Sequence, residues 1–362
     1  MLRIIAIFAI IPIFLTSCSE RAIDIPTAHI NRGINISGAL EAPTEGEWGV
    51  VIEEWFFEEI AEKGFKSVRI PVRFSAYLDS APPYTLDPQL LNRVEQLVEW
   101  AVEQNLTVII DVHNFRELLE NPDENKQEFY AIWDQLTVRF EDYGSELIFE
   151  LLNEPEGQLT VESWNAIQLE AVRRIREIDQ DRWIMITGYP WGLSQSLDNI
   201  QLPGETERII ATFHFYEPYL FTHQGAPWLG EEYQTTGITW PGPPSEPIEP
   251  VEAAKENPDF ARWFEQYNTL PYLFNPAGPK PIKNRLKQAR DWSFKTGIPV
   301  VMGEFGTYEI IDTPSRRRWT RFVKEQADEY GISWIFWDFA GTFGILDLNT
   351  GEWNEQILEV LF

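Results

Sequence analysis

Two glutamates in this sequence follow apolar runs and stand in short motifs of polar residues, glycine and proline. Glu154 lies in an Asn-Glu-Pro motif after the run that begins at Leu147, and Glu304 lies in a Gly-Glu-Phe-Gly motif after the run that begins at Ile298. A pair of carboxyl groups can hydrolyse a glycosidic bond, because one donates a proton to the leaving oxygen while the other attacks the anomeric carbon. A separation of roughly 5 Å would give retention of configuration, and roughly 6.5 to 9.5 Å would give inversion.

Other polar and aromatic side chains stand at the ends of further apolar runs. They are Arg69, His113, Asn114, Asn153, His214, Tyr216 and Trp337. Taken singly, each has a simpler explanation: Arg69 could form an ion pair between strands, His113 could be a structural histidine, and Trp337 could belong to the core. A single site explains the whole set better, because it accounts for polar or aromatic groups at every informative run end.

The runs that must position these residues are apolar, rich in Val and Ile, and alternate with amphipathic helical patterns. They span residues 32–37, 66–72, 106–112, 147–153, 182–188, 208–216, 298–306 and 332–339. Near-continuous apolar strands indicate a parallel sheet covered on both faces. Eight such units, with no Gly-x-Gly-x-x-Gly motif after any run, predict an α/β fold of the (β/α)₈ TIM barrel type rather than a doubly wound sheet. The carboxyl ends of its strands would then meet at one face, where the sites of such barrels lie.

Helix start signals support this alternation. Asp87-Pro88, Thr160 and Thr313-Pro314-Ser315 each precede a helical pattern. One connection departs from it: residues 217–280 form a long insertion after the sixth run, rich in proline and aromatic residues. Long connections are usually functional or disordered. Because this one is rich in aromatic residues that can pack, we predict an ordered segment that forms part of a substrate cleft.

Composition narrows the possible partners. The chain has 29 Lys and Arg against 57 Asp and Glu, a net charge of −28, which argues against binding nucleic acid. A metal-dependent hydrolase is also disfavoured, because His113 and His214 lie on separate runs, without a His-x-His pair and with few aspartates near run ends. We therefore expect no metal ion and no cofactor, and a monomeric protein.

The N-terminal residues have the pattern of an export signal. Residues 1–18 hold one basic residue, an apolar run and small residues before Cys18, the single cysteine of the chain. Leu-Thr-Ser-Cys resembles a bacterial lipobox, in which the cysteine is lipidated; the alternative is a plain signal peptide. We expect a linker over 19–30, a catalytic domain over 31–362, and a membrane-anchored lipoprotein at the cell surface or in the periplasm, or else a secreted protein.

Six motifs in chain order carry a family resemblance. They are "SVRIPVRF", "DVHN", "FELLNEPEG", "ATFHFYEP", "VVMGEFGTYE" and "WIFWDFA", and together they resemble the glycoside hydrolases of family 5 in clan A, the cellulase-type barrel enzymes. The resemblance runs from about Arg32 to the C-terminus. It implies that Glu154 is the general acid/base and Glu304 the nucleophile, and that Arg69 and Tyr216 hydrogen-bond Glu304.

The resemblance also implies substrate contacts. Asn153 would donate a hydrogen bond to the 2-hydroxyl of the sugar under attack, and His214 would lie near the acid/base. His113 and Asn114 would bind the same region, with Trp337 as a stacking floor. The segment 214–228 resembles one found in family members that act on β-1,4-glucans, so Trp228, His223 and Gln224 are further candidates; Glu156 could simply be solvated.

The function implied by the resemblance is a retaining endo-acting hydrolase of internal β-1,4-glucosidic bonds in a polysaccharide. Members that act as β-mannanases, lichenases or xyloglucanases share the same catalytic frame, so the preferred polymer stays open. A non-catalytic carbohydrate-binding lipoprotein is the alternative from another class. It would keep the tryptophans but need not keep both glutamates.

Overall fold

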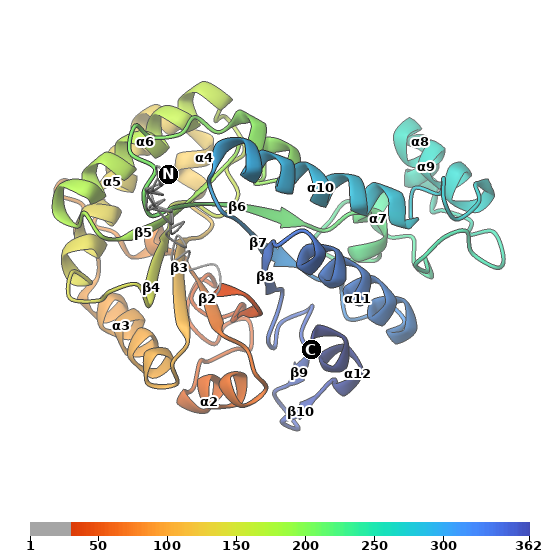
Figure 1. Ribbon diagram of the computed structural model, residues 1–362, viewed down its shortest axis with the longest axis horizontal. Coiled ribbons are helices and arrows are strands. Elements are labelled where there is room, and N and C mark those ends of the chain that lie inside the picture. The colour runs from red at the N-terminus through yellow and green to blue at the C-terminus, as the bar shows by residue number, and fades with distance from the viewer. Residues whose placement is uncertain (1–29) are drawn as a thin grey trace, which may run out of the picture.

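Eight parallel strands close into a barrel in which each strand pairs with the next and β8 pairs with β1 (Figure 1). The computed structural model describes residues 30–362. The strands are β1 Gly33–Asn35, β2 Ser67–Val72, β3 Thr107–Val112, β4 Leu147–Glu150, β5 Trp183–Thr187, β6 Ile209–Phe215, β7 Val300–Phe305 and β8 Ser333–Phe336. Each predicted run contains one of them, so the predicted (β/α)₈ barrel is confirmed.

Helices surround the barrel and connect its strands (Figure 1). They are α2 Glu54–Glu62, α3 Pro88–Glu103, α4 Arg116–Glu120, α5 Pro122–Arg139, α6 Val161–Ile178, α7 Tyr219–Thr222, α8 Glu252–Glu256, α9 Pro258–Thr269, α10 Pro279–Thr296, α11 Thr313–Glu329 and α12 Glu355–Leu361, with the 3-10 helices η1 Phe74–Tyr77, η2 Ser194–Asn199 and η3 Glu231–Tyr233. A short hairpin, β9 Leu346–Asp347 and β10 Glu352–Trp353, follows the barrel.

Two of the predicted helix starts are confirmed within one residue, and the third helix begins three residues earlier than predicted. Asp87 caps α3 by accepting a hydrogen bond from a backbone N–H, and Thr160 caps α6 in a capping box. Helix α11 already begins at Thr313, because the preceding Asp312 accepts from the backbone N–H of Ser315 and acts as the cap.

The strands β4 and β8 end three residues earlier than the predicted runs. β4 ends at Glu150 rather than at Asn153, and β8 ends at Phe336, so Trp337 follows the strand. The chain after β4 still runs between its neighbours, since the N–H of Asn153 donates to the carbonyl of Val112 at 3.1 Å. Trp337, after β8, likewise donates its backbone N–H to the carbonyl of Phe305 at 2.9 Å. These residues lie past the strand ends but stay attached to the neighbouring strands, so their side chains are held at the mouth of the barrel.

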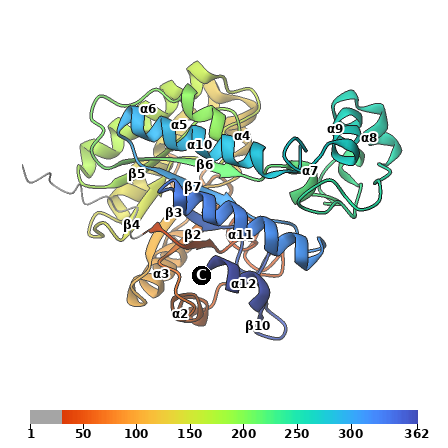
Figure 2. The ribbon, with the colours of Figure 1, turned by 45° about the vertical axis from the view of Figure 1, so that its right-hand side comes forward.

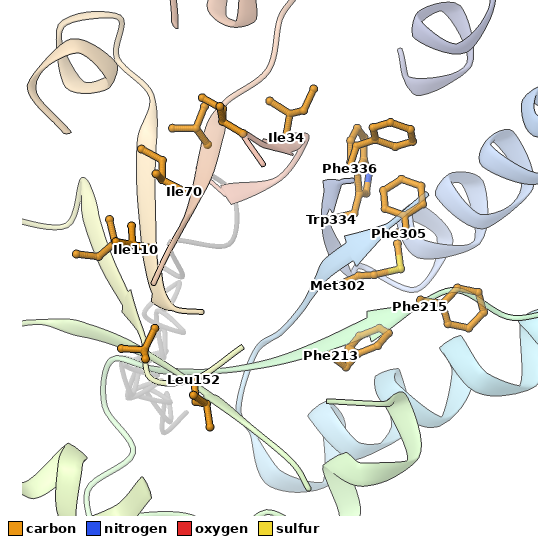
Figure 3. Packing of buried hydrophobic residues seen from close by; sticks show 14 of the residues in the cluster. Ile34, Ile70, Ile110, Leu152, Phe213, Phe215, Met302, Phe305, Trp334 and Phe336 are labelled. Atoms are coloured by element: carbon orange, nitrogen blue, oxygen red, sulfur yellow. The ribbon is translucent and has the colours of Figure 1, made fainter. Parts of the chain in front are cut away.

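Alternation along each strand separates two hydrophobic regions. One set of residues packs against the helices, as Ile70, Ile110 and Phe213 do (Figure 3). The other set forms a small separate cluster made of Ile30, Ile109, Ile148, Met185, Ile210, Val301 and Ile335. Because these residues alternate with the helix-facing ones, they fill the barrel interior.

Polar residues replace apolar ones two positions further along the same strands. Asp111 follows Ile109 and Glu150 follows Ile148, and both carboxylates are fully buried. The interior therefore changes from an apolar floor to a polar layer toward the carboxyl ends of the strands. That layer lies directly beneath the mouth of the barrel.

The insertion at 217–280 is ordered, as predicted, and contains several short helices. It contains α7, η3, α8 and α9, and α10 then returns to the barrel. Figures 1 and 2 both show α8 and α9 as a lobe set apart from the barrel. The lobe has its own packing, in which Phe264 and Tyr267 are buried and Trp263 stacks on Tyr267 with ring centroids 5.0 Å apart.

The predicted leader over 1–18, including Cys18, lies outside the described residues. Ile30, at the end of the predicted linker, is fully buried, and its carbonyl accepts a hydrogen bond from Ser67 at 2.6 Å. From residue 30 onward, no helix has the length and apolar character needed to cross a membrane.

Candidate active site

A cleft of about 1850 Å³ lies over the carboxyl ends of the strands. The predicted site residues that line it are His113, Asn114, Asn153, Glu154, His214, Tyr216, Trp228, Glu304 and Trp337. Arg69 lies beneath them and is fully buried. The structure thus brings together residues from six segments that are far apart in the sequence.

The two glutamates face each other closely. One carboxylate oxygen of Glu154, one of Glu304 and a ring nitrogen of His214 all lie within 4.8 Å of one another. This spacing matches the roughly 5 to 5.5 Å of retaining glycosidases and is shorter than the roughly 6.5 Å minimum of inverting ones. No room is left between the two groups for the water molecule that inversion requires.

Arg69 organises the layer under the glutamates. Its Nε and Nη2 bind Glu150 in a bidentate pair at 2.7 and 3.0 Å, and Nη1 donates to Glu304 at 2.9 Å. The remaining donors reach the amide oxygens of Asn35 at 3.0 Å and Asn153 at 2.7 Å. All five N–H groups of the guanidinium therefore have an acceptor, so this cation is locked in one orientation.

The contact with Arg69 also sets the orientation of the side-chain amide of Asn153. Because the oxygen of Asn153 accepts from Arg69, its NH₂ group is the part left to face the cleft. The side chain of Asn153 is consequently oriented as a donor toward any hydroxyl-bearing ligand, as the sequence interpretation requires.

Both oxygens of Glu304 accept hydrogen bonds. Arg69 donates to one, and the hydroxyl of Tyr216 donates to the other at 2.8 Å, as predicted for both residues. Burial, and then the charge of Glu304, raise the pKa of Tyr216 well above its usual value, so this phenol stays protonated. These two donors hold the carboxyl group of Glu304 in one rotamer.

Glu154 has different surroundings. Its carboxyl group meets Nδ1 of His214 at 2.7 Å, and burial raises the pKa of Glu154 to about 7. About a third of the side chain, 35%, remains open to the cleft, where a proton donor must reach its substrate. Burial also lowers the pKa of His214, so a neutral imidazole accompanies a protonated acid. Glu154 is thereby set to hold a proton near neutral pH, where an ordinary glutamate has lost it.

His113 and Trp337 form one wall of the site. Their rings lie nearly parallel, at 9°, with centroids 6.2 Å apart, and both line the cleft. Nδ1 of His113 meets a carboxylate oxygen of Asp111 at 2.8 Å. Burial lowers the pKa of His113, but the adjacent Asp111 raises it more, so the net shift is upward.

The candidates from the insertion separate into two groups. Trp228 is half exposed and lines the cleft, and His223 also lines it although it is buried. The prediction for Gln224 is wrong, because its buried amide bonds the backbone of Phe221 and Ile238 instead. Glu156 accepts a hydrogen bond from the indole N–H of Trp191 at 2.6 Å, which gives it a partner beyond water.

Sequence reasoning missed the acids of the buried layer. It found few aspartates near run ends, whereas the structure places Asp111 and Glu150 directly below the site. Within residues 30–362, Glu154, His214 and Glu304 form a group that could hold a metal ion. The fixed positive charge of Arg69 against Glu304, however, opposes a cation at that position. The sequence did contain a signal, because each of these acids lies inside an otherwise apolar run. Asp111 is two residues before His113, and Glu150 is three residues before Asn153.

Arg69 offers a stability prediction. We expect Arg69→Met to lower the free energy of unfolding by about 3–5 kcal/mol, because it leaves buried carboxylates without their counter-charge. Urea denaturation would measure this, with Arg173→Met as control, since Arg173 pairs with Glu170 and Glu177 on an exposed helix face. The control should lose no more than about 1 kcal/mol. Equal losses in the two variants would contradict the proposed importance of the buried network.

Comparisons with known proteins agree with this geometry. Residues 30–342 match the family model for Cellulase (glycosyl hydrolase family 5). The chain is 31% identical over 356 residues to Endoglucanase H of Acetivibrio thermocellus, covering 96% of this chain and 34% of that protein. It is also 31% identical over 325 residues to Endoglucanase C of the same organism, covering 85% and 90%. The chain thus spans about a third of the length of Endoglucanase H.

Solved structures give the same result. Cel5A of Thermotoga maritima, in structures with cellobiose and with mannotriose, superposes with a TM-score of 0.80 at 36% identity. The match covers 93% of this chain and 100% of that one in both structures. With a family model that matches most of its length, relatives of this kind and a paired-glutamate cleft in a (β/α)₈ barrel, the chain belongs to glycosyl hydrolase family 5.

Proposed function

We propose that this protein is a retaining endo-β-1,4-glucanase in which Glu304 is the nucleophile and Glu154 the general acid/base. The observation that carries the proposal is the pair itself: two carboxyl groups within 4.8 Å of each other, one bound by Arg69 and Tyr216, the other held by a neutral histidine. An acid and a base side by side are what a double displacement at an anomeric carbon requires.

In the first half-reaction, the Glu304 carboxylate attacks the anomeric carbon while Glu154 transfers its proton to the glycosidic oxygen. The bond to the leaving sugar breaks, and a covalent glycosyl-enzyme ester forms at Glu304. Asn153, with its NH₂ group facing the cleft, donates to the 2-hydroxyl of the attacked sugar, and Trp337 supports the face of that sugar.

In the second half-reaction, Glu154 acts as a base. Once Glu304 is esterified, its negative charge is gone, so Glu154 can hold a charge and accept a proton from water. The resulting hydroxide attacks the anomeric carbon, and the bond to Glu304 breaks. Two inversions restore the original configuration, with both glutamates returned to their starting protonation states.

This mechanism predicts a pH profile. Because Glu154 must carry a proton and its pKa is raised to about 7, kcat/KM should be high below about pH 7 and fall about tenfold per pH unit above it. An ordinary glutamate would already be ionised in that range. Initial rates on a soluble β-glucan would measure the profile, and Glu154→Gln should abolish this basic limb. A limb that persists in the variant would assign the titration to another group.

The preferred polymer is the next question. The endoglucanase relatives and the cellobiose complex of Cel5A support a β-1,4-glucan, while the mannotriose complex keeps β-mannan as a second candidate. Trp48 and Trp191, exposed at 55% and 49%, also line the long cleft and could stack on sugars of an internal chain segment. This arrangement supports endo action.

A panel of carboxymethyl-cellulose, mixed-linkage glucan, xyloglucan and mannan tests the proposal. Release of reducing ends, together with a rapid fall in viscosity, is expected first on carboxymethyl-cellulose. A preference for mixed-linkage glucan, xyloglucan or mannan would reassign the protein to lichenase, xyloglucanase or mannanase. Binding without the release of reducing ends on any polymer would favour the non-catalytic carbohydrate-binding alternative.

We further propose that Cys18 is lipidated and anchors an exported, monomeric protein to a bacterial membrane. The support is the lipobox-like Leu-Thr-Ser-Cys and the absence of any other cysteine in the sequence. Cys18→Ala is expected to move the protein from the membrane fraction to the soluble exported fraction. A Cys18→Ala protein that still fractionates with membranes would refute the anchor. Light scattering of the released protein should give the mass of one chain.

A further inference from the structure

The α8–α9 lobe reaches the catalytic cleft through a series of aromatic contacts. Phe260 on α9 packs edge-to-face on Tyr233 of η3, with ring centroids 4.9 Å apart. Tyr233 packs edge-to-face on Tyr219 at 5.7 Å, and Tyr219 stacks on His223 at 3.9 Å with an angle of 16°. His223 in turn packs against Tyr216, which binds Glu304. A continuous series of ring contacts therefore connects the lobe to the catalytic centre.

Tyr219 is the member of this series that faces the substrate. It lines the cleft and is 40% exposed, while His223 and Tyr233 hold its ring from two sides. Its hydroxyl makes no hydrogen bond to any of residues 30–362, in contrast to the hydroxyl of Tyr216. A fixed ring with a free hydroxyl in a cleft is suited to bind a sugar hydroxyl.

The position of Tyr219 identifies which sugar it meets. His223 and Tyr216 lie between Tyr219 and Glu304, which must sit beneath the sugar it attacks. Among residues 30–362 the ring of Tyr219 contacts His223 and Tyr233, and not the wall of His113 and Trp337 that supports the attacked sugar. Its segment directly follows β6, whose His214 bonds Glu154. Since Glu154 protonates the oxygen that departs with the leaving sugar, a polar group of this segment, outside the wall under the attacked sugar, borders the leaving sugar.

We propose that Tyr219 binds the leaving sugar through its hydroxyl, and that Phe260 in the α8–α9 lobe fixes the orientation of Tyr219 through Tyr233. Tyr219 is then a substrate-binding residue and Phe260 a positioning residue. The inference rests on the proposed function, because it assigns a contact on the leaving-group side of the same reaction. It gives the insertion a role in recognition of the sugar chain.

Two substrates distinguish binding of the leaving sugar from a general effect of Tyr219 on catalysis or structure. Cellotetraose must place sugars on the leaving side. In 2,4-dinitrophenyl β-cellobioside the leaving group is 2,4-dinitrophenolate, which needs no sugar contact there. Tyr219→Phe, which removes only the hydroxyl, is expected to lower kcat/KM on cellotetraose about three- to tenfold. The loss on the aryl substrate should be at least threefold smaller.

Phe260→Ala should produce the same selective loss. It should add little when combined with Tyr219→Phe, because both changes remove the same contact. Phe274→Ala is the matched control: it is an aromatic residue of the insertion, 66% exposed, and is not among the residues that line the cleft. Phe274→Ala should leave kcat/KM unchanged on both substrates. If Phe260→Ala fails to fold, Tyr219→Phe alone still decides the substrate contact.

Several outcomes would overturn the inference. Equal losses of kcat/KM on both substrates would mean that Tyr219 contacts the attacked sugar or has only a structural role. An unchanged kcat/KM on cellotetraose would show that the hydroxyl of Tyr219 does not bind the leaving sugar. Fully additive losses of kcat/KM from Tyr219→Phe and Phe260→Ala would show that Phe260 does not act by positioning Tyr219. A wild-type protein that hydrolyses neither substrate would instead overturn the proposed function, and this inference with it.

Discussion

Glu304→Gln should lower turnover of a soluble β-glucan by at least about 10³-fold while leaving the fold intact. The amide has the shape of the carboxylate and can still contact Arg69 and Tyr216, but it cannot attack the anomeric carbon. Reducing-end release and thermal unfolding would be measured on the same preparation. Glu325→Gln, which makes the same chemical change on an exposed part of α11, should retain wild-type activity.

The smaller variant Glu304→Ala tests the role rather than the importance of this residue. Azide should enter the space left by the side chain and attack the anomeric carbon from the same face, so the expected product is the α-glycosyl azide. Formation of that product, identified by NMR on an aryl cellobioside, would identify Glu304 as the nucleophile. Near-normal turnover of natural polymer by either variant would show that the assignment is wrong.

Glu154→Gln should have the second-largest effect, with turnover of natural polymer reduced by about 10²- to 10⁴-fold. The leaving sugar is a poor leaving group and needs the proton that this variant cannot supply. An aryl cellobioside with a good leaving group does not need that proton, so its first half-reaction should survive. The second half-reaction should be slow, because water lacks its base, and a burst of released phenol is therefore expected.

The burst distinguishes the two glutamates. Glu304→Gln should show no burst with any leaving group, because no glycosyl-enzyme can form. In Glu154→Ala, azide should attack the accumulated intermediate from the face opposite Glu304 and give the β-glycosyl azide. Equal losses of Glu154→Gln on natural and aryl substrates, without a burst, would contradict the acid/base role.

The buried layer explains why the two glutamates differ although they are the same residue type. Arg69 distributes one positive charge over Glu150, Glu304 and Asp111, while Glu154 lies above this layer and has His214 as its direct partner. The surroundings of each glutamate are therefore set by residues on other strands. The motifs around Glu154 and Glu304 imply their roles by resemblance, but they do not contain these partners.

Much of the fold could be predicted because period and patterning are local properties. Apolar runs of strand length, separated by amphipathic patterns with caps such as Thr160, specify alternating strands and helices wherever they occur. The order of such units restricts the closed barrel to one topology, and the topology brings run ends to one face. This is why Glu154, His214 and Glu304 could be grouped before any coordinates were known.

Periodicity and motif order were enough to predict the barrel, the run ends that carry the site, and the family resemblance. Side-chain directions and distances required the folded chain: the 4.8 Å grouping of Glu154, His214 and Glu304, the buried acids Asp111 and Glu150, and the burial of the Gln224 amide against backbone groups. It also decided that the insertion contacts the cleft through Tyr219. The physical reason is that residue types and periods follow from neighbours in the chain, whereas distances, burial and pKa values follow from groups on other strands.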